Sequence, residues 1–330
     1  MRAGQLLAMY RRFQSGTGIV GVAYGPKEVN RDSRGQTPAV AFFVEKKLPI
    51  KGARRILADG RRRLPKYVEL DGHEVPTDVI MVGAGTPATP GTRSPPQIYR
   101  AGGKISNMQL TGTLGCLVSS NNNAPGVYAI TNQHIGLSAG SAIAFPDFRT
   151  IGAIIGTTTA SVGLVADESF LPPFDQPRAY VDVDSALVRI PSNFENRFSA
   201  DIPNFGKPSA VFTPNLASPA AFVNSLLGLQ VYAYGWASGP RFGKVSHVYY
   251  VYRRDPVGME QVSTFLVSSA DAGPPGIVGD SGKLWMTKIG GQNVGVGIHS
   301  GVVADSPTSS RFAMVTELSS LMRFLRIRLL

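Results

Sequence analysis

The chain has 330 residues, 43% of them hydrophobic, which is enough to bury one large core or two modest ones. Its 37 glycines and 24 prolines favour short strands joined by many turns and argue against a helical bundle. A single cysteine, Cys116, excludes an intrachain disulfide and fits a reducing compartment. The opening residues are charged and no stretch has the length of a membrane-spanning helix, so we expect a cytoplasmic protein without a signal peptide.

The net charge of +11 is concentrated near the start of the chain. Residues 1–104 contain 18 Lys and Arg against 8 Asp and Glu, whereas residues 105–330 contain 15 against 14. The basic residues include Arg54, Arg55 and three arginines at 61–63. Such a segment could bind nucleic acid, an acidic partner or a regulatory protein; the alternative is a solvated basic surface.

The first 83 residues predict a small α+β extension. Apolar residues at helical spacing predict a helix over residues 4–14, and apolar runs predict strands over 18–25 and 38–49. Residues 64–83 predict further short strands around a turn at Asp71 and Gly72. Residues 84–104 begin with a Pro/Gly/Thr-rich segment that has little to bury, and we interpret them as a linker.

From about residue 105 the pattern changes to recurring apolar runs separated by Gly, Asn and Pro clusters. This rhythm is typical of an antiparallel β-sandwich or β-barrel. The end of the chain differs, because its leucines fall on one face of a helix over about residues 316–328.

The sharpest local motif is Gly279-Asp280-Ser281-Gly282. A serine hydroxyl becomes a useful nucleophile when a base takes its proton and backbone amides stabilise the resulting oxyanion. Flanking glycines allow a turn tight enough to direct several amides to one point, and those of Gly279 and Ser281 are the candidates. By itself the motif is also compatible with a surface turn.

Two further segments could complete a nucleophilic site. His134 follows the apolar run 127–131, where an imidazole could act as the general base. Asp182 and Asp184 alternate with valines between the histidine and the serine, so both could lie on one face of a strand. A carboxylate there could hold the imidazole in one tautomer and stabilise its charged form.

At this point the sequence resembles the chymotrypsin/trypsin superfamily. The order His, Asp, Ser and the separations of 50 and 97 residues are similar to that superfamily. The motif around His134 is similar too, although Asn132 and Gln133 replace the usual alanines. The segment 184–190 resembles the aspartate strand, which favours Asp184 over Asp182, and GDSG resembles the nucleophile loop, with Lys283 in place of a second glycine.

A finer resemblance is to disulfide-free bacterial trypsin-like proteins related to the plant narrow-leaf proteases. It is carried by the segment GTLGCLV at 112–118, the turn GWASG at 235–239 and PTDV at 76–79. The resemblance implies a mainly β protein with two antiparallel Greek-key β-barrels. They would span about 105–195 and 205–315, follow the α+β extension and precede a C-terminal helix.

The resemblance implies a serine endopeptidase that cleaves a protein or peptide substrate. Its catalytic residues would be His134, Asp184 and Ser281, and its oxyanion hole would be formed by the amides of Gly279 and Ser281. No cofactor is expected. We also expect no metal, because His73 and His247 have no acidic or thiol neighbours at ligand spacing.

The family forms its specificity pocket from residues before the nucleophile and from the strand after it, which here places Pro275, Gly297, His299 and Ser300 in the pocket. Pro275 stands where trypsin has an aspartate, so a preference for Lys or Arg is not supported. His299 occupies the position that binds an acidic side chain in glutamyl endopeptidases of the superfamily. It is a candidate to recognise Glu or Asp, or alternatively a wall residue bonded to the backbone.

Two questions stay open. In trypsin, the aspartate beside the nucleophile pairs with an N-terminal amine created by zymogen cleavage; here Asp280 would need processing, another cation or a partner that acts through the N-terminal region. The rival hypothesis for the whole chain is a catalytically silent scaffold that binds protein or nucleic acid through its basic extension.

Overall fold

The computed structural model describes residues 3–13, 19–27, 37–44, 64–70, 72–81, 98–121, 125–146, 153–166, 170, 180–253, 259–306 and 309–330. The basic residues at 54, 55 and 61–63 lie outside the described residues, as does the first part of the predicted linker, 84–97. The protein is mainly β, as predicted.

Barrel one is a closed ring of antiparallel strands. Strand β6 pairs with β7 and β10, and the ring continues through β11, β12 and β9 to β8, which follows β7 in the chain. Its strands are β6 (Lys104–Ser106), β7 (Thr111–Thr113), β8 (Leu117–Ser120), β9 (Val127–Thr131), β10 (Ala142–Phe145), β11 (Ala153–Ala166) and β12 (Tyr180–Arg189). Between β7 and β8, Gly115 donates its N–H to the carbonyl of Ile130, so the ring has no gap there.

Barrel two is a second closed antiparallel ring, in the order β15, β16, β17, β20, β19, β18 and back to β15. Its strands are β15 (Gln230–Gly235), β16 (Gly239–Arg253), β17 (Glu260–Ser269), β18 (Leu284–Ile289), β19 (Gln292–Ser306) and β20 (Ser309–Glu317). Because β17 neighbours β20 rather than β18, the connections follow a Greek key. The two-barrel architecture is therefore the predicted one.

Strand β12 joins the barrels. Eight of its ten residues are buried, which explains why valines and small residues fill it. Its first residues, Tyr180 and Val181, pair in parallel with β17 of barrel two and its later residues pair with β9, while β11 pairs with β12 from Tyr180 to Arg189. The aspartates that it carries therefore lie where the two barrels meet.

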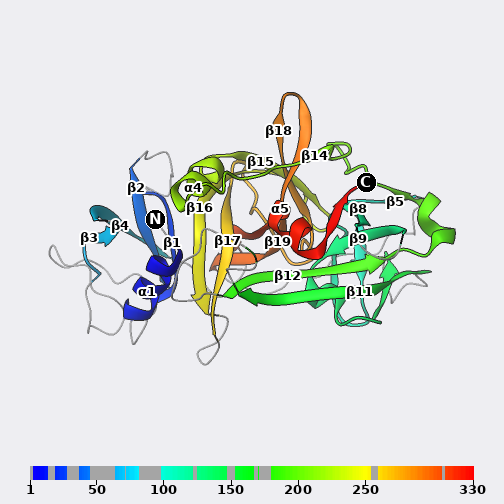
Figure 1. Cartoon of the computed structure of the whole chain (residues 1–330), viewed down its shortest axis with the longest axis horizontal. Coiled ribbons are helices and arrows are strands. Elements are labelled where there is room, and N and C mark those ends of the chain that lie inside the picture. The colour runs from blue at the N-terminus through cyan, green and yellow to red at the C-terminus, as the bar shows by residue number, and fades with distance from the viewer. Residues whose placement is uncertain are drawn as a thin grey trace.

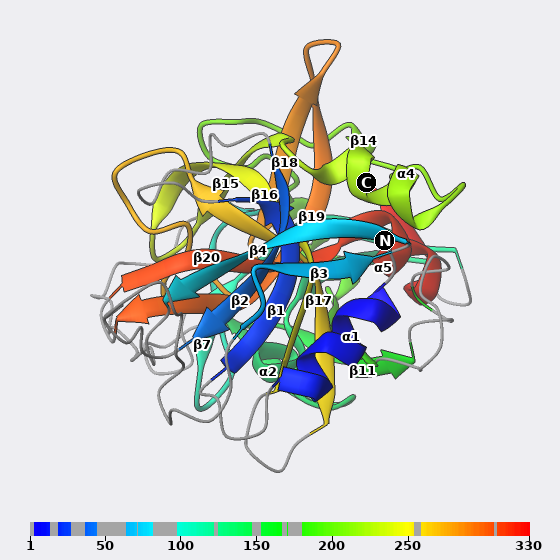
Figure 2. The same ribbon diagram turned by 90° about the vertical axis from the view of Figure 1, so that its left-hand side faces the viewer.

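The N-terminal extension packs against barrel two, although barrel one follows it in sequence (Figures 1 and 2). It contains α1 (Ala3–Phe13), β1 (Ile19–Pro26), β2 (Pro38–Val44), β3 (Tyr67–Leu70) and β4 (His73–Met81). Strand β1 pairs antiparallel with the second half of β16, with Val22 opposite Val251. The apolar side of α1 is buried at Leu6, Leu7 and Tyr10. Hydrogen bonding and apolar packing thus both attach the extension to barrel two.

Short elements complete the fold: β5 (Tyr99–Arg100), α2 (Gln133–Gly136), η1 (Ser192–Arg197), β13 (Phe198–Ser199), β14 (Ala210–Val211), α4 (Pro219–Leu226), α5 (Leu318–Leu325) and β21 (Ile327–Leu329). Strand β5 lies inside the segment predicted as linker, and its Tyr99 is buried against Phe145 and Phe198. The C-terminal helix is present but shorter than the predicted 316–328. It ends because Arg326 adopts a left-handed backbone with φ of 54°, after which β21 pairs with β8 of barrel one.

None of the helices in the described part of the chain is both long and apolar enough to span a bilayer.

Candidate active site

His134 lies on α2, the short helix that follows β9. The carbonyl oxygen of Asn132 accepts the N–H groups of Ile135 and Gly136, at 3.2 and 2.8 Å, and so closes this turn. Asn107 reinforces it by donating its side-chain amide to the carbonyl of Ile135 at 2.8 Å. The backbone that carries the imidazole is therefore fixed, while its side chain remains one-third exposed.

Asp184 holds the His134 ring from behind. Its Oδ2 lies 2.8 Å from Nδ1 of His134, and its Oδ1 accepts the His134 backbone N–H at 3.3 Å. Asp184 has a φ of 36°, which is uncommon outside glycine, and a register shift opposite Gly163 places it at a β-bulge. The Asn132 side chain donates to the Asp184 carbonyl at 2.6 Å and thereby supports this bent backbone.

The bulge separates the two candidate aspartates. Regular alternation would have placed Asp182 and Asp184 on one face of the strand. Instead, the carboxylate of Asp182 accepts a hydrogen bond from the hydroxyl of Tyr252, a residue of barrel two. Of the two, Asp184 is the one that contacts His134.

Ser281 lies in the loop between β17 and β18, and this loop crosses onto barrel one. Thr113 donates its backbone N–H to the Ser281 carbonyl at 2.7 Å and its hydroxyl to the Gly279 carbonyl at 2.8 Å. A Cβ on Gly282 would lie 2.6 Å from the hydroxyl of Thr131, three residues before His134. The loop is thus pressed against the end of β9, from which His134 follows. Within the described residues the Ser281 hydroxyl makes no hydrogen bond, so the structure joins His134 to Asp184 but not to Ser281.

The two candidate oxyanion amides carry no internal hydrogen bond. In the described part of the chain, neither the Gly279 N–H nor the Ser281 N–H has a protein acceptor, whereas the intervening Asp280 N–H donates to the Ile277 carbonyl at 3.0 Å. Gly279 has a φ of 96°, a conformation that glycine adopts without strain. This loop can therefore offer two donors to an incoming oxygen.

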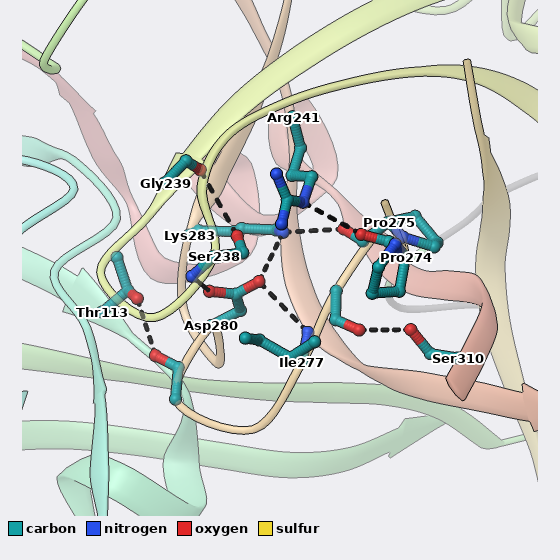
Figure 3. A network of polar contacts seen from close by, with 12 residues as sticks. Thr113, Ser238, Gly239, Arg241, Pro274, Pro275, Ile277, Asp280, Lys283 and Ser310 are labelled. Atoms are coloured by element: carbon teal, nitrogen blue, oxygen red, sulfur yellow. Dashed lines mark hydrogen bonds and ion pairs between the residues drawn. The ribbon is translucent and has the colours of Figure 1, made fainter. Parts of the chain in front are cut away.

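The Asp280 side chain lies in a buried polar network with Lys283, Ser238 and Ile277 (Figure 3). Its Oδ2 lies 2.8 Å from Nζ of Lys283, and neither side chain has any exposed surface. Its Oδ1 accepts the Ser238 N–H at 3.0 Å. Burial alone would raise the pKa of Asp280, but the Lys283 charge, the nearby His299 and the hydrogen bonds from Lys283 and Ser238 together outweigh that effect and lower the pKa. The sequence did not identify the cation that pairs with Asp280, and in the structure it is Lys283.

The predicted pocket residues occupy different environments. Pro275 is buried, and its carbonyl accepts a hydrogen bond from Lys283 Nζ at 2.7 Å. Gly297 faces Val315 and Phe265 inside barrel two. The His299 ring lies against Gly276, where a Cβ would sit 2.8 Å from Nε2. Burial, and then the Lys283 charge, lower the pKa of His299 to about 3, so its imidazole is neutral near pH 7.

Ser300 is also buried, and in the described chain its hydroxyl has no hydrogen-bond partner. Among the described residues, no group of three His, Cys, Asp or Glu side chains is arranged to hold a metal ion. Cys116 is buried, and burial raises the pKa of its thiol to about 12, which makes it a poor nucleophile.

Sequence reasoning missed the contributions of Thr113 and Asn132. A single threonine in a short strand carries no local signal, and Thr113 becomes important only because the Ser281 loop folds onto it. Asn132 did carry a signal, because it stands where the superfamily has an alanine. Its role became visible only with the bulge at Asp184.

Comparison with solved structures finds chains of similar fold. Protease A of Thermobifida fusca is 18% identical, covering 71% of this chain and 98% of that chain, with a TM-score of 0.44. A Nocardiopsis protease is 19% identical, covering 70% and 98%, with a TM-score of 0.44. A glutamic-acid-specific serine protease, described as using a histidine triad in substrate binding, is 15% identical, covering 70% and 100%, with a TM-score of 0.46.

Comparison with curated proteins finds no significant match. The family model described as the Nal1 C-terminal domain, however, matches residues 91–309. That span includes β6 to β19 and therefore the histidine, aspartate and serine segments. It confirms the predicted relationship to the plant narrow-leaf proteins, and the chain belongs to the Nal1 C-terminal domain family.

Proposed function

We propose that the chain is a serine endopeptidase with His134, Asp184 and Ser281 as its catalytic residues. The observation that carries the proposal is the 2.8 Å contact between His134 and Asp184, beside a serine loop whose Gly279 and Ser281 amides have no acceptor among the described residues. The proposal also requires a hydrogen bond between Ser281 and His134. Ser281 is half-buried and can change its χ1 rotamer at small cost, and hydrogen bonds between catalytic residues often form only when substrate binds.

The chemistry follows from these positions. Ser281 attacks the scissile carbonyl while His134 accepts its proton, and Asp184 stabilises the imidazolium that forms. The amides of Gly279 and Ser281 hold the oxyanion of the tetrahedral intermediate. His134 then protonates the leaving amine, and water hydrolyses the acyl-enzyme by the same route. The substrate is a protein or peptide, and the lone buried thiol suits a reducing compartment such as the cytoplasm.

A fluorophosphonate probe tests the nucleophile, because it reacts covalently with an activated serine. We expect labelling of the wild-type chain and its loss in Ser281→Ala and His134→Ala. A correctly folded wild-type chain that is never labelled would instead support the catalytically silent scaffold.

The aspartate assignment has a matched pair of variants. Asp184→Asn places an amide against Nδ1 of His134 and favours the wrong tautomer, so labelling should slow by about 10³- to 10⁴-fold. Asp182→Asn keeps an acceptor for the Tyr252 hydroxyl and should leave the labelling rate unchanged. Equal rates for the two variants would contradict the role of Asp184.

Profiling cleavage of a peptide library tests whether His299 recognises acidic side chains. Cleavage after Glu or Asp supports this hypothesis. If none of the cleaved bonds follows an acidic residue, the hypothesis is rejected.

A further inference from the structure

Asp280 lies between the two residues whose amides would hold the oxyanion, and its side chain is directed into the protein. Besides Lys283, its carboxylate accepts the N–H groups of Ser238 and Ile277, at 3.0 and 3.2 Å. A fully buried carboxylate is stable only when it is paired and hydrogen-bonded. If these partners were lost, Asp280 would turn toward solvent and the amides on either side of it would turn as well.

Lys283 is fixed as the partner by its own backbone. Its N–H donates to the Asp280 carbonyl at 2.9 Å, and its carbonyl accepts the His299 N–H at 2.9 Å, which binds the residue to β19. From this position Nζ reaches Asp280 Oδ2 at 2.8 Å and the Pro275 carbonyl at 2.7 Å, and it lies 4.9 Å from the centre of the Trp285 ring. Figure 3 shows Nζ of Lys283 between the Asp280 carboxylate and the Pro275 carbonyl.

Arg241 is nearby but is engaged elsewhere. Its guanidinium donates to the carbonyls of Pro274 and Pro240, at 3.1 and 2.9 Å. Lys283 is therefore the cation that forms an ion pair with Asp280 within the described residues.

We propose that Lys283 is a positioning residue that holds the Ser281 loop in its oxyanion-binding conformation, in place of a newly formed N-terminal amine. The inference rests on the proposed function. It follows that the loop needs no proteolytic cleavage to reach this conformation, because the cation is supplied from within the loop itself.

The charge state of Lys283 makes the proposal testable by pH. The charged and titratable groups that influence it are Asp280, Arg241, Asp271 and the imidazole of His299. Burial lowers the pKa of Lys283, and the attraction of Asp280 opposes this without cancelling it. Raising the pH should therefore remove the proton earlier than from an exposed lysine, and the loop should lose its oxyanion-binding conformation.

The experiment measures fluorophosphonate labelling rates of Lys283→Met and Lys283→Arg against pH, using a chain with an uncleaved N-terminal tag. Lys283→Met should label at least about 100-fold more slowly at pH 7.5, the cost of losing an oxyanion donor. Lys283→Arg should retain labelling. Its alkaline limit, the pH above which the labelling rate falls, should lie higher than that of wild type, because a guanidinium keeps its proton to above about pH 12. Lys288→Met, at an exposed lysine of strand β18, which begins directly after Lys283, is the matched control.

Hydrogen exchange of the backbone over residues 277–283 supplies a readout independent of catalysis, and we expect faster exchange in Lys283→Met than in wild type or Lys288→Met. The proposal is overturned by unchanged exchange in a folded Lys283→Met, by equal labelling of Lys283→Met and wild type, or by labelling confined to cleaved chains. If Lys283→Met does not fold, the alkaline limits of wild type and Lys283→Arg decide, and coincident limits overturn the proposal. Absence of labelling in wild type refutes the proposed function instead. In that case the hydrogen-exchange rates still decide whether Lys283 holds the loop.

Discussion

Two histidines of this chain are buried as neutral side chains. His247 packs between Phe43 and Phe312, with ring centroids 5.6 and 5.2 Å away. Burial, followed by the nearby Arg311, lowers the pKa of His247 to about 3. His299 has the same lowered value. Each therefore favours folding above pH 6.5, because the unfolded chain binds a proton below that pH and the folded chain does not.

Acid should consequently destabilise the protein well before its carboxylates titrate. As the pH falls from about 6.5 toward 3, each of these histidines should lower the unfolding free energy by about 1.4 kcal/mol per pH unit. Between pH 7 and 5, His247→Leu should reduce the loss by about 2 kcal/mol, measured by urea unfolding. The exposed His73→Leu is the control. An unchanged pH dependence in His247→Leu would contradict the assignment.

At the scale of elements, the Ser281 loop depends on a glycine that no other residue can replace. Gly282 has a φ of 95°, and a Cβ there would collide with the carbonyl of Thr113 as well as approach Thr131. The contact is so close because the loop of barrel two rests directly on the β7 and β9 strands of barrel one. The second glycine of the motif is therefore required by the interface between the barrels.

Gly282→Ala should destabilise the fold by roughly 3 kcal/mol or more and abolish fluorophosphonate labelling. Gly291→Ala separates backbone strain from collision, because Gly291 has a φ of 81° but no atom of the described residues would lie within 4 Å of its Cβ. We expect about 1–2 kcal/mol for Gly291→Ala, from left-handed strain alone, with labelling retained. Urea unfolding measures both, and similar costs for the two variants would refute the collision.

At the scale of the whole molecule, the extension and barrel two are joined by charge as well as by β1. Arg11 of α1 donates from Nε and Nη2 to Oε2 of Glu260, at 3.0 and 2.9 Å, and Arg253 donates to Oε1 at 2.8 Å. Burial would raise the pKa of Glu260, but the two arginines, Arg11 first, lower it overall. One carboxylate thus links the first helix to strands β16 and β17.

Glu260→Gln should weaken both contacts and destabilise the chain by about 1–3 kcal/mol, because two cations lose their shared partner. Arg11→Ala should cost less, about 1 kcal/mol or below, since its side chain is 44% exposed. A double-mutant cycle between these sites in urea unfolding measures their coupling. Additive effects would show that α1 is held by apolar packing alone.

Local patterns determined much of the fold. Alternating apolar residues and turn residues act over a few positions, so several strands of each barrel, the α+β extension and the C-terminal helix could be predicted from the sequence. The motifs around His134, Asp184 and Ser281 indicated the superfamily and which residues to examine. Their catalytic roles remain predictions that the labelling experiments test.

Contacts between distant segments were decided only by the tertiary structure. The bulge that brings Asp184 rather than Asp182 to His134 depends on pairing with β11 and on Asn132. Likewise, β1 pairs with β16 of barrel two and β21 pairs with β8 of barrel one, although neither strand's own residues specify a partner. Lys283 appeared in the sequence as a departure from the superfamily motif, and only the closed loop revealed that it neutralises Asp280. Strand pairing and buried charge depend on which surfaces meet in space, and a local pattern carries no record of that.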